Sequence, residues 1–143
     1  MEVIKIIRIY VDMVADLFHY GHVNLLKKAR ECGDYLLVGI HSDEVVESYK
    51  RKPILTIKER MATVAACRYV DKVIPDAPLI VTHDWIEENE IDVVVHGNDF
   101  TNDMRDICYK VPIEMGIYKE VTYTPGISTT EIIARCKIAA ADS

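Results

Sequence analysis

Two histidines three residues apart, His19 and His22, stand between the first expected strand and the first expected helix. At a helix start they face the same side, where backbone amides and the helix dipole attract an anion. Imidazoles can donate hydrogen bonds to phosphate oxygens, and Gly21 between them permits close backbone approach. The pair alone leaves three interpretations open: phosphate contact, metal ligation, and surface or structural histidines. Metal ligation is the weakest, because no carboxylate or cysteine is placed to complete a zinc site.

Two further loops carry groups that can bind an anion. A basic run, Lys-Arg-Lys, occupies positions 50–52, although such charge runs are usually solvated surface. A glycine turn, Gly-Ile-Ser-Thr-Thr, leads into the last expected helix at positions 126–130. Helix starts of this kind serve as simple caps or as phosphate cradles of amides and hydroxyls. The second use requires that the histidine loop lie beside this turn.

The elements that must position these loops alternate between strand and helix. Short β-branched runs predict strands at 4–11, 35–41, 72–74, 91–95 and about 119–123. Apolar periodicity and capping signals predict helices at 22–32, 42–49, 56 to about 68, 82–89 and about 105–115, and one that begins at Ser128. This order indicates an α/β doubly wound parallel sheet, in which ligands bind at the carboxyl ends of the strands.

Length and charge exclude several classes of protein. The 143 residues are the size of one domain, predicted to span 1–143, and 17 Lys and Arg against 23 Asp and Glu give a net charge of −6. An overall negative chain repels a polyanion, so no nucleic-acid partner is expected. The apolar runs are far shorter than the ~20 residues of a membrane span, and we expect a cytoplasmic protein with no integral membrane segment. The four widely separated cysteines argue against structural zinc and disulfides.

The order of these motifs resembles one known family. His-Tyr-Gly-His at 19–22, an arginine after a capped helix start, Arg-Tyr-Val-Asp at 68–71 and Gly-Ile-Ser-Thr-Thr at 126–130 are together similar to the cytidylyltransferases. Segments 33–36, 38–44, 75–78 and 95–99 look most like the ethanolamine-phosphate enzymes, and the choline-phosphate and glycerol-3-phosphate enzymes come next. The resemblance implies a Rossmann-like nucleotidyltransferase fold.

The resemblance also implies an activity and a set of site residues. CMP would pass from CTP, with Mg²⁺ as the usual partner of the triphosphate, to a phospho-alcohol, which yields a CDP-alcohol and pyrophosphate for phospholipid precursor synthesis. His19, His22 and Lys50 would be the catalytic residues. A structural role is an equal alternative for the two arginines in the nucleotide-binding set. That set comprises Asp16, Gly21, Arg60, Arg68, Gly126, Ile127, Ser128 and Thr129.

A carboxylate near the end of the fourth strand predicts the acceptor. By the same resemblance, Asp99 with His96 and Asn98 would bind an ammonium head group, which favours phosphoethanolamine or phosphocholine over glycerol 3-phosphate. A homodimer is expected from the family as well.

Two positions depart from the family pattern. Met13 stands where the family has a glycine, and Tyr123 stands where it has an arginine near the triphosphate. Tyrosine supplies no charge. The alternatives are therefore a weakly active or inactive nucleotide-binding relative, a glycerol-3-phosphate cytidylyltransferase, or, less favoured, an adenylyltransferase.

Overall fold

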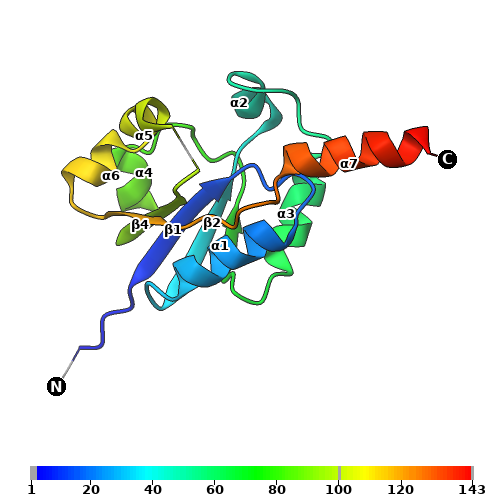
Figure 1. Cartoon of the computed structure of the whole chain (residues 1–143). Coiled ribbons are helices and arrows are strands. Elements are labelled where there is room, and N and C mark those ends of the chain that lie inside the picture. Colours follow the sequence, from blue (N-terminus) through cyan, green and yellow to red (C-terminus); the bar gives the residue numbers. More distant parts are fainter. Residues whose placement is uncertain (1–2, 100, 143) are drawn as a thin grey trace.

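Five parallel strands form the centre of the computed structural model, which describes residues 3–99 and 101–142 (Figure 1). The strands are β1 (Arg8–Met13), β2 (Tyr35–Ile40), β3 (Lys72–Ile74), β4 (Val93–Gly97) and β5 (Tyr118–Val121). Their order in the sheet is β3-β2-β1-β4-β5, with every neighbouring pair parallel. This topology confirms the predicted doubly wound sheet. The outermost positions of the predicted domain, 1–2 and 143, lie outside the described residues.

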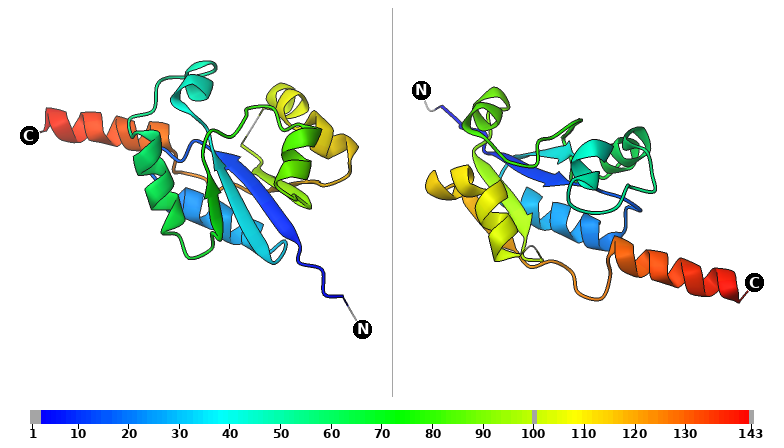
Figure 2. Two further views of the ribbon diagram at one scale, coloured as in Figure 1. Left: turned by 180° about the vertical axis from the view of Figure 1, so that it is seen from behind. Right: turned by 90° about the horizontal axis from the view of Figure 1, so that it is seen from above.

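Helices cover both faces of the sheet. On one face α1 (Tyr20–Arg30) and α3 (Ile57–Ala65) pack on the first core cluster. On the other face α4 (His83–Glu88), α5 (Asn102–Cys108) and α6 (Lys110–Glu114) pack on the second. The short α2 (Asp43–Glu47) follows the carboxyl end of β2. The last helix, α7 (Thr129–Ala141), extends away from the body and has no buried residue (Figures 1 and 2).

Strand alternation decides which side chain reaches which face. Along β1, Ile9 and Val11 enter the first core cluster, whereas Tyr10 enters the second. Because side chains alternate between the two faces of the sheet, Met13 lies on the face covered by α1 and Asp12 lies on the opposite face. The carboxyl end of β1 therefore presents a thioether and a carboxylate in opposite directions.

The first predicted strand is wrong at its amino end. Val3 and Ile4 are 93% and 88% exposed, and β1 begins only at Arg8, which pairs with the first residue of β2, Tyr35. The β-branched run is thus longer than the strand, because its first residues have no neighbouring strand to pair with. The hydrophobic pattern of the sequence does not predict where that pairing begins. The fourth strand is also displaced, since it runs from Val93 to Gly97.

The helix predicted near 105–115 is two helices that meet at Tyr109. Pro112 has no N–H to donate to the carbonyl of Cys108, and that carbonyl instead accepts from Val81 N at 2.9 Å. The capped starts are confirmed, because Thr56 and Glu59 form a reciprocal capping box and Ser128 Oγ accepts from Glu131 N. Within residues 3–99 and 101–142, no helix has the length and apolarity to cross a membrane.

Gly39 on β2 is expected to resist substitution. A Cβ placed on it would lie 2.7 Å from Cβ of Ala77 and would also meet the Tyr10 hydroxyl. We expect Gly39→Ala to lower the free energy of unfolding by about 1–3 kcal/mol through overpacking, as measured by urea denaturation. The exposed helical substitution Lys58→Ala is the control, and an effect of Gly39→Ala no larger than that of the control would contradict the prediction.

Candidate functional site

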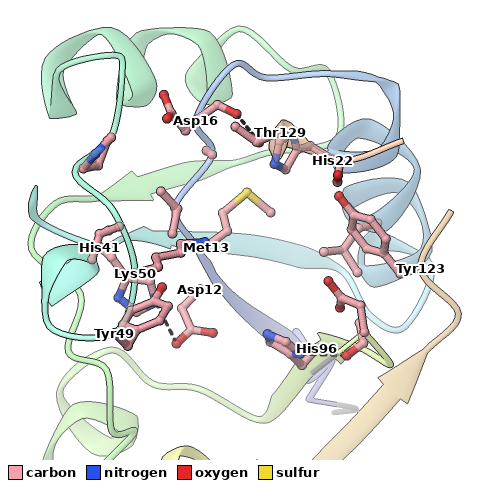
Figure 3. A pocket seen from close by; sticks show the side chains of 18 of the residues that line it. Asp12, Met13, Asp16, His22, His41, Tyr49, Lys50, His96, Tyr123 and Thr129 are labelled. Atoms are coloured by element: carbon pink, nitrogen blue, oxygen red, sulfur yellow. Dashed lines mark hydrogen bonds and ion pairs between the residues drawn. The ribbon is translucent and has the colours of Figure 1, made fainter. Parts of the chain in front are cut away.

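A cavity of about 260 Å³ opens at the carboxyl ends of β1, β2 and β4 (Figure 3). Its walls come from these strand ends, from the loop after α2 and from the start of α7. This is where a doubly wound sheet is expected to bind ligands. The lining side chains that could bind a ligand or take part in a reaction are Asp12, Met13, Asp16, His22, His41, Tyr49, Lys50, Arg51, His96, Asp99, Cys108, Tyr109, Tyr123, Ser128, Thr129 and Thr130.

The two histidines of the first motif cap helix α1 reciprocally. His19 is the N-cap residue, and its Nδ1 accepts a hydrogen bond from Gly21 N at 3.1 Å. In return, His22 Nδ1 accepts from His19 N at 3.1 Å. Imidazoles thus occupy the places that a hydroxyl and a carboxylate fill in an ordinary capping box. The ring centroids lie 3.9 Å apart, and the His22 ring lines the cavity.

This capping arrangement determines the tautomer of both rings. A backbone amide only donates, so each Nδ1 is an acceptor and each neutral ring carries its proton on Nε2. Burial, followed by the charges of His19 and Lys50, lowers the pKa of His22 to about 3, and burial also lowers the pKa of His19. His19 Nε2 is buried and has no hydrogen-bond partner among the described residues. Two neutral N–H donors are therefore held at a helix amino terminus.

Gly21 allows these rings and the start of α7 to approach each other. A Cβ at this position would lie 2.9 Å from His19 Cε1 and 3.2 Å from Ile127 Cγ2. Gly126 adopts a φ of +82°, which favours glycine and turns the chain into α7. The structure therefore brings the histidine loop and the glycine turn together, which is the condition for a shared phosphate site.

Asp16 holds the surrounding loops in place. Its carboxylate accepts from the backbone amides of Ile54 and Leu55 at 2.8 and 3.0 Å, and its carbonyl accepts from Thr129 Oγ1 at 2.7 Å. Its neighbours Ala15 and Leu17 have positive φ values of 57° and 49°, a strained conformation for residues with a Cβ. Asp16 lines the cavity, but these bonds give it a positioning role.

Lys50 and Arg51 of the basic run line the cavity, and Lys52 is exposed elsewhere. Burial and the charge of Arg51 lower the pKa of Lys50, while Asp16 and Asp99 oppose that shift. The run is therefore more than a solvated surface loop, because its first two cations face the same space as His22 and Ser128.

Nucleotide binding and a structural role are both predicted for Arg60, and its contacts support the structural role. Its side chain is 0% exposed, and its guanidinium donates to the carbonyls of Leu55, Val14 and His41 and to the Asp43 carboxylate. These bonds occupy most of its N–H groups within the protein. Arg60 is a scaffold residue behind the cavity.

Arg68 does not line the cavity either. It is exposed beyond the carboxyl end of α3, where it bonds to the Tyr69 hydroxyl at 2.9 Å. Because α3 runs back toward the amino ends of the parallel strands, Arg68 lies at the end of the sheet opposite the cavity. The motif 68–71 therefore contributes no lining side chain.

Two of the three residues expected to bind the acceptor line the cavity, and the third positions a lining residue. His96 and Asp99 line the cavity, with His96 Nδ1 2.7 Å from the Gly97 carbonyl and its ring 5.0 Å from that of Tyr109. Asn98 instead accepts the amide of Tyr123 at 2.9 Å through its side-chain carbonyl. This bond positions Tyr123, whose pKa is raised to about 12 by burial and by Asp99.

Sequence reasoning missed a buried cluster of Asp12, His41 and Tyr109. The Tyr109 hydroxyl donates to Asp12 Oδ1 at 2.5 Å, and His41 Nε2 lies 3.4 Å from Asp12 Oδ2. Asp12, His41 and His96 follow the same strand parity at the ends of β1, β2 and β4, so they share one face. A period-of-two count along the three strands is the signal that would have found them.

The geometry of this cluster favours an ion pair. His41 Nδ1 lies 3.0 Å from the Ala77 carbonyl, which can only accept, so that nitrogen carries a proton while Nε2 faces a carboxylate. Burial opposes charge on both groups, but the pairing outweighs it and raises the pKa of His41 and lowers that of Asp12. Asp12 Oδ2 has no hydrogen-bond partner of good geometry among the described residues.

The arrangement joins two chemical environments in one cavity. Neutral imidazole N–H groups, Lys50, Arg51 and the start of α7 can hold several phosphate oxygens. Across from them, Asp12 with its aromatic neighbours can accept a cation. No group of three or more His, Cys, Asp or Glu side chains in the described ranges is arranged to hold a metal ion.

Comparisons with known proteins agree with this geometry. Residues 12–135 match the protein family described as Cytidylyltransferase-like. The ethanolamine-phosphate cytidylyltransferase of Dictyostelium discoideum is 48% identical over 132 residues, which cover 89% of this chain and 37% of that protein. The choline-phosphate cytidylyltransferase 2 of Arabidopsis thaliana is 37% identical over 135 residues, which cover 90% of this chain and 44% of that protein. This chain thus spans less than half the length of each of these relatives.

A solved structure shares the fold. The lipopolysaccharide core biosynthesis protein from Thermoplasma volcanium superposes with a TM-score of 0.69 and 26% identity, covering 84% of this chain and 98% of that one. The match extends over nearly the whole of that protein.

Arg60 and Arg68 should differ in their effect on stability. Arg60→Met leaves the carbonyls of Leu55, Val14 and His41 without a donor, and we expect a loss of about 3–5 kcal/mol in the free energy of unfolding. Arg68→Met removes an exposed side chain and should change it by less than about 0.5 kcal/mol. Urea denaturation of both variants tests this, and equal losses would refute the assignment of Arg60 as the scaffold.

The buried, neutral His22 should make stability depend on acid pH. Below about pH 6.5 the unfolded chain binds a proton at this position that the folded chain does not bind until the pH approaches about 3. The free energy of unfolding should therefore fall with decreasing pH, by at most about 1.4 kcal/mol per pH unit from this group. In His22→Gln that contribution disappears.

Denaturation of wild type and His22→Gln at intervals between about pH 6 and about pH 4 measures the difference in slope. The variant His83→Gln, at an exposed position, should keep the wild-type slope. Parallel curves for the wild type and His22→Gln would show that His22 is protonated as readily in the folded chain as in the unfolded one.

Proposed function

This chain belongs to the cytidylyltransferase-like family, and from that premise we propose that it transfers CMP from CTP to a phosphorylated amino alcohol, with phosphoethanolamine as the acceptor. The observation that carries the proposal is the placement, in one cavity, of His22, the start of α7 and Lys50, with His19 joined to His22 through their reciprocal cap. The similarity to ethanolamine-phosphate cytidylyltransferases supports the choice of acceptor.

The reaction needs no covalent nucleophile from the protein. A phosphate oxygen of the acceptor attacks the α-phosphorus of CTP, the bond from that phosphorus to the oxygen bridging the α- and β-phosphates breaks, and pyrophosphate leaves. Catalysis is then positioning and stabilisation of the charge on the five-coordinate phosphorus. The Nε2–H groups of His19 and His22 supply donors that are already oriented by their caps.

Lys50 and the start of α7 bind different phosphate groups. Lys50 reaches the acceptor phosphate and the α-phosphate together, which offsets the repulsion between two anions. The Ser128 hydroxyl and the backbone amides at Ser128 and Thr129 bind the β- and γ-phosphates at the positive end of α7. Gly21, Gly126 and Ile127 keep the two helix starts close, and Asp16 anchors Thr129.

The head group of the acceptor lies against carboxylates. Asp12 lines the cavity, and its Oδ2, which is ion-paired with His41 at 3.4 Å, keeps a lone pair that can accept an N–H from a primary ammonium. Asp99 and His96 line the wall beside it, and Tyr109 offers an aromatic ring to a cation. A quaternary ammonium has no N–H to give Asp12, which favours phosphoethanolamine over phosphocholine.

Mg²⁺ is proposed as a companion of CTP. Magnesium usually keeps several of its waters and is bound mainly through substrate phosphates, which the start of α7 would hold in this cavity. The donor set therefore fits an ion carried in by the triphosphate. Bound there, it would neutralise charge on the departing pyrophosphate.

The homodimer expected from the family remains a prediction.

A paired lysine experiment tests the proposal. Product analysis of CTP, Mg²⁺ and phosphoethanolamine should detect CDP-ethanolamine with the wild type, and Lys50→Ala should lower kcat/KM by about a hundredfold, the scale of one lost charge-stabilising donor. Lys52→Ala removes an exposed cation of the same run and should retain activity within about twofold.

Thermal shift with CTP and with ATP accompanies that assay, because a ligand that binds the folded state raises the Tm. A shift selective for CTP supports the nucleotide site even where turnover is slow. The proposal is wrong if CTP produces no shift and neither phosphoethanolamine, phosphocholine nor glycerol 3-phosphate gives a CDP product.

A further inference from the structure

Met13 stands at the point where the two parts of the cavity meet. It is the last residue of β1, its side chain is 8% exposed, and it lines the cavity. In Figure 3 it lies in the middle of the lining side chains, with His22 and Thr129 on one side and Asp12 on the other. A thioether thus lies between Asp12 and two members of the proposed phosphate site, His22 and Thr129.

The free space is small for the proposed reaction. The cavity measures about 260 Å³, whereas sites for single small ligands span roughly 300–1,000 Å³. A nucleoside triphosphate and a phospho-alcohol must share this space with their reacting phosphates in contact. The residue in the centre of the cavity therefore determines whether both can be present together.

The backbone of Met13 cannot move aside easily. It pairs with Ile40 of β2, and its carbonyl accepts from His41 N at 3.1 Å. Its side chain, in contrast, is unbranched and has three rotatable bonds, so it can change shape without disturbing the strand. Rotation of this side chain would therefore open the centre while the strand stays in place.

We propose that Met13 is a movable partition whose side chain separates the acceptor from the nucleotide and must rotate away before the two phosphates can meet. This inference rests on the proposed function. It makes Met13 a positioning residue that limits the transfer step and affects the binding of each substrate alone much less.

Shortening the side chain should therefore speed transfer. In single-turnover assays, Met13→Ala is expected to form CDP-ethanolamine about three to ten times faster than the wild type, the factor that corresponds to removing one unfavourable rotamer. The midpoint of the thermal shift against CTP concentration should change less than about threefold.

Met61→Ala is the matched control. Met61 of α3 packs against the same core cluster but is not among the residues that line the cavity. This control should lose stability as Met13→Ala does, through a lost core side chain, and keep the wild-type transfer rate. A faster rate in both variants would attribute the gain to loosening of the core and overturn the partition.

Two further substitutions keep the test decisive if Met13→Ala folds poorly. Valine is favoured in strands and is shorter than methionine, so the transfer rate of Met13→Val should lie between those of the wild type and Met13→Ala. Met13→Phe fills the centre with a stiffer ring and should slow transfer. A rate that does not follow the order Ala, Val, Met, Phe contradicts the partition.

The failure of this inference differs from that of the proposed function. Wild-type protein that binds CTP and forms product no more slowly than Met13→Ala leaves the function standing and overturns the partition alone. Absence of both CTP binding and product in the wild type and in every Met13 variant overturns the function, and the partition with it. Product from Met13→Ala but not from the wild type supports both.

Discussion

The buried guanidinium of Arg60 is the contact on which the geometry of the cavity depends. It holds the carbonyls of Val14, His41 and Leu55, which belong to three segments distant in sequence, and it pairs with Asp43 at the start of α2. Asp16 completes the same framework from the other side through the amides of residues 54 and 55. A charged group without access to water is stable only when it is fully hydrogen-bonded, so these loops have little freedom to separate.

Within that framework, the pleat of the strands separates two kinds of chemistry. Consecutive residues at the end of β1 point to opposite faces, so Asp12 joins His41 and Tyr109 while Met13 turns toward His22. Helix starts and neutral imidazoles gather on one side, and a paired carboxylate on the other. The cavity can thus treat a phosphate and an ammonium differently although they are a few bonds apart in the acceptor.

Local signals in the sequence predicted local structure well. The Thr56–Glu59 box, the Ser128 cap and the alternation of strand and helix all appear as expected, because each depends on groups within a few residues of one another. The boundaries were less predictable. Residues 4–6 have the composition of a strand but no neighbouring strand to pair with, and the break at Tyr109 follows from Pro112, which has no N–H to continue the helix.

The sequence by itself therefore determined the order of elements, the caps and the presence of phosphate-binding motifs. The tertiary structure alone decided which of two motif arginines is a scaffold, which carboxylate lies at the cavity floor and where the Met13 side chain is placed. Arg60 and Arg68 are both arginines near one helix, and only long-range partners distinguish them. The physical reason is that a cap closes over a few bonds, whereas a cavity is made by side chains from strands that meet only when the sheet is assembled.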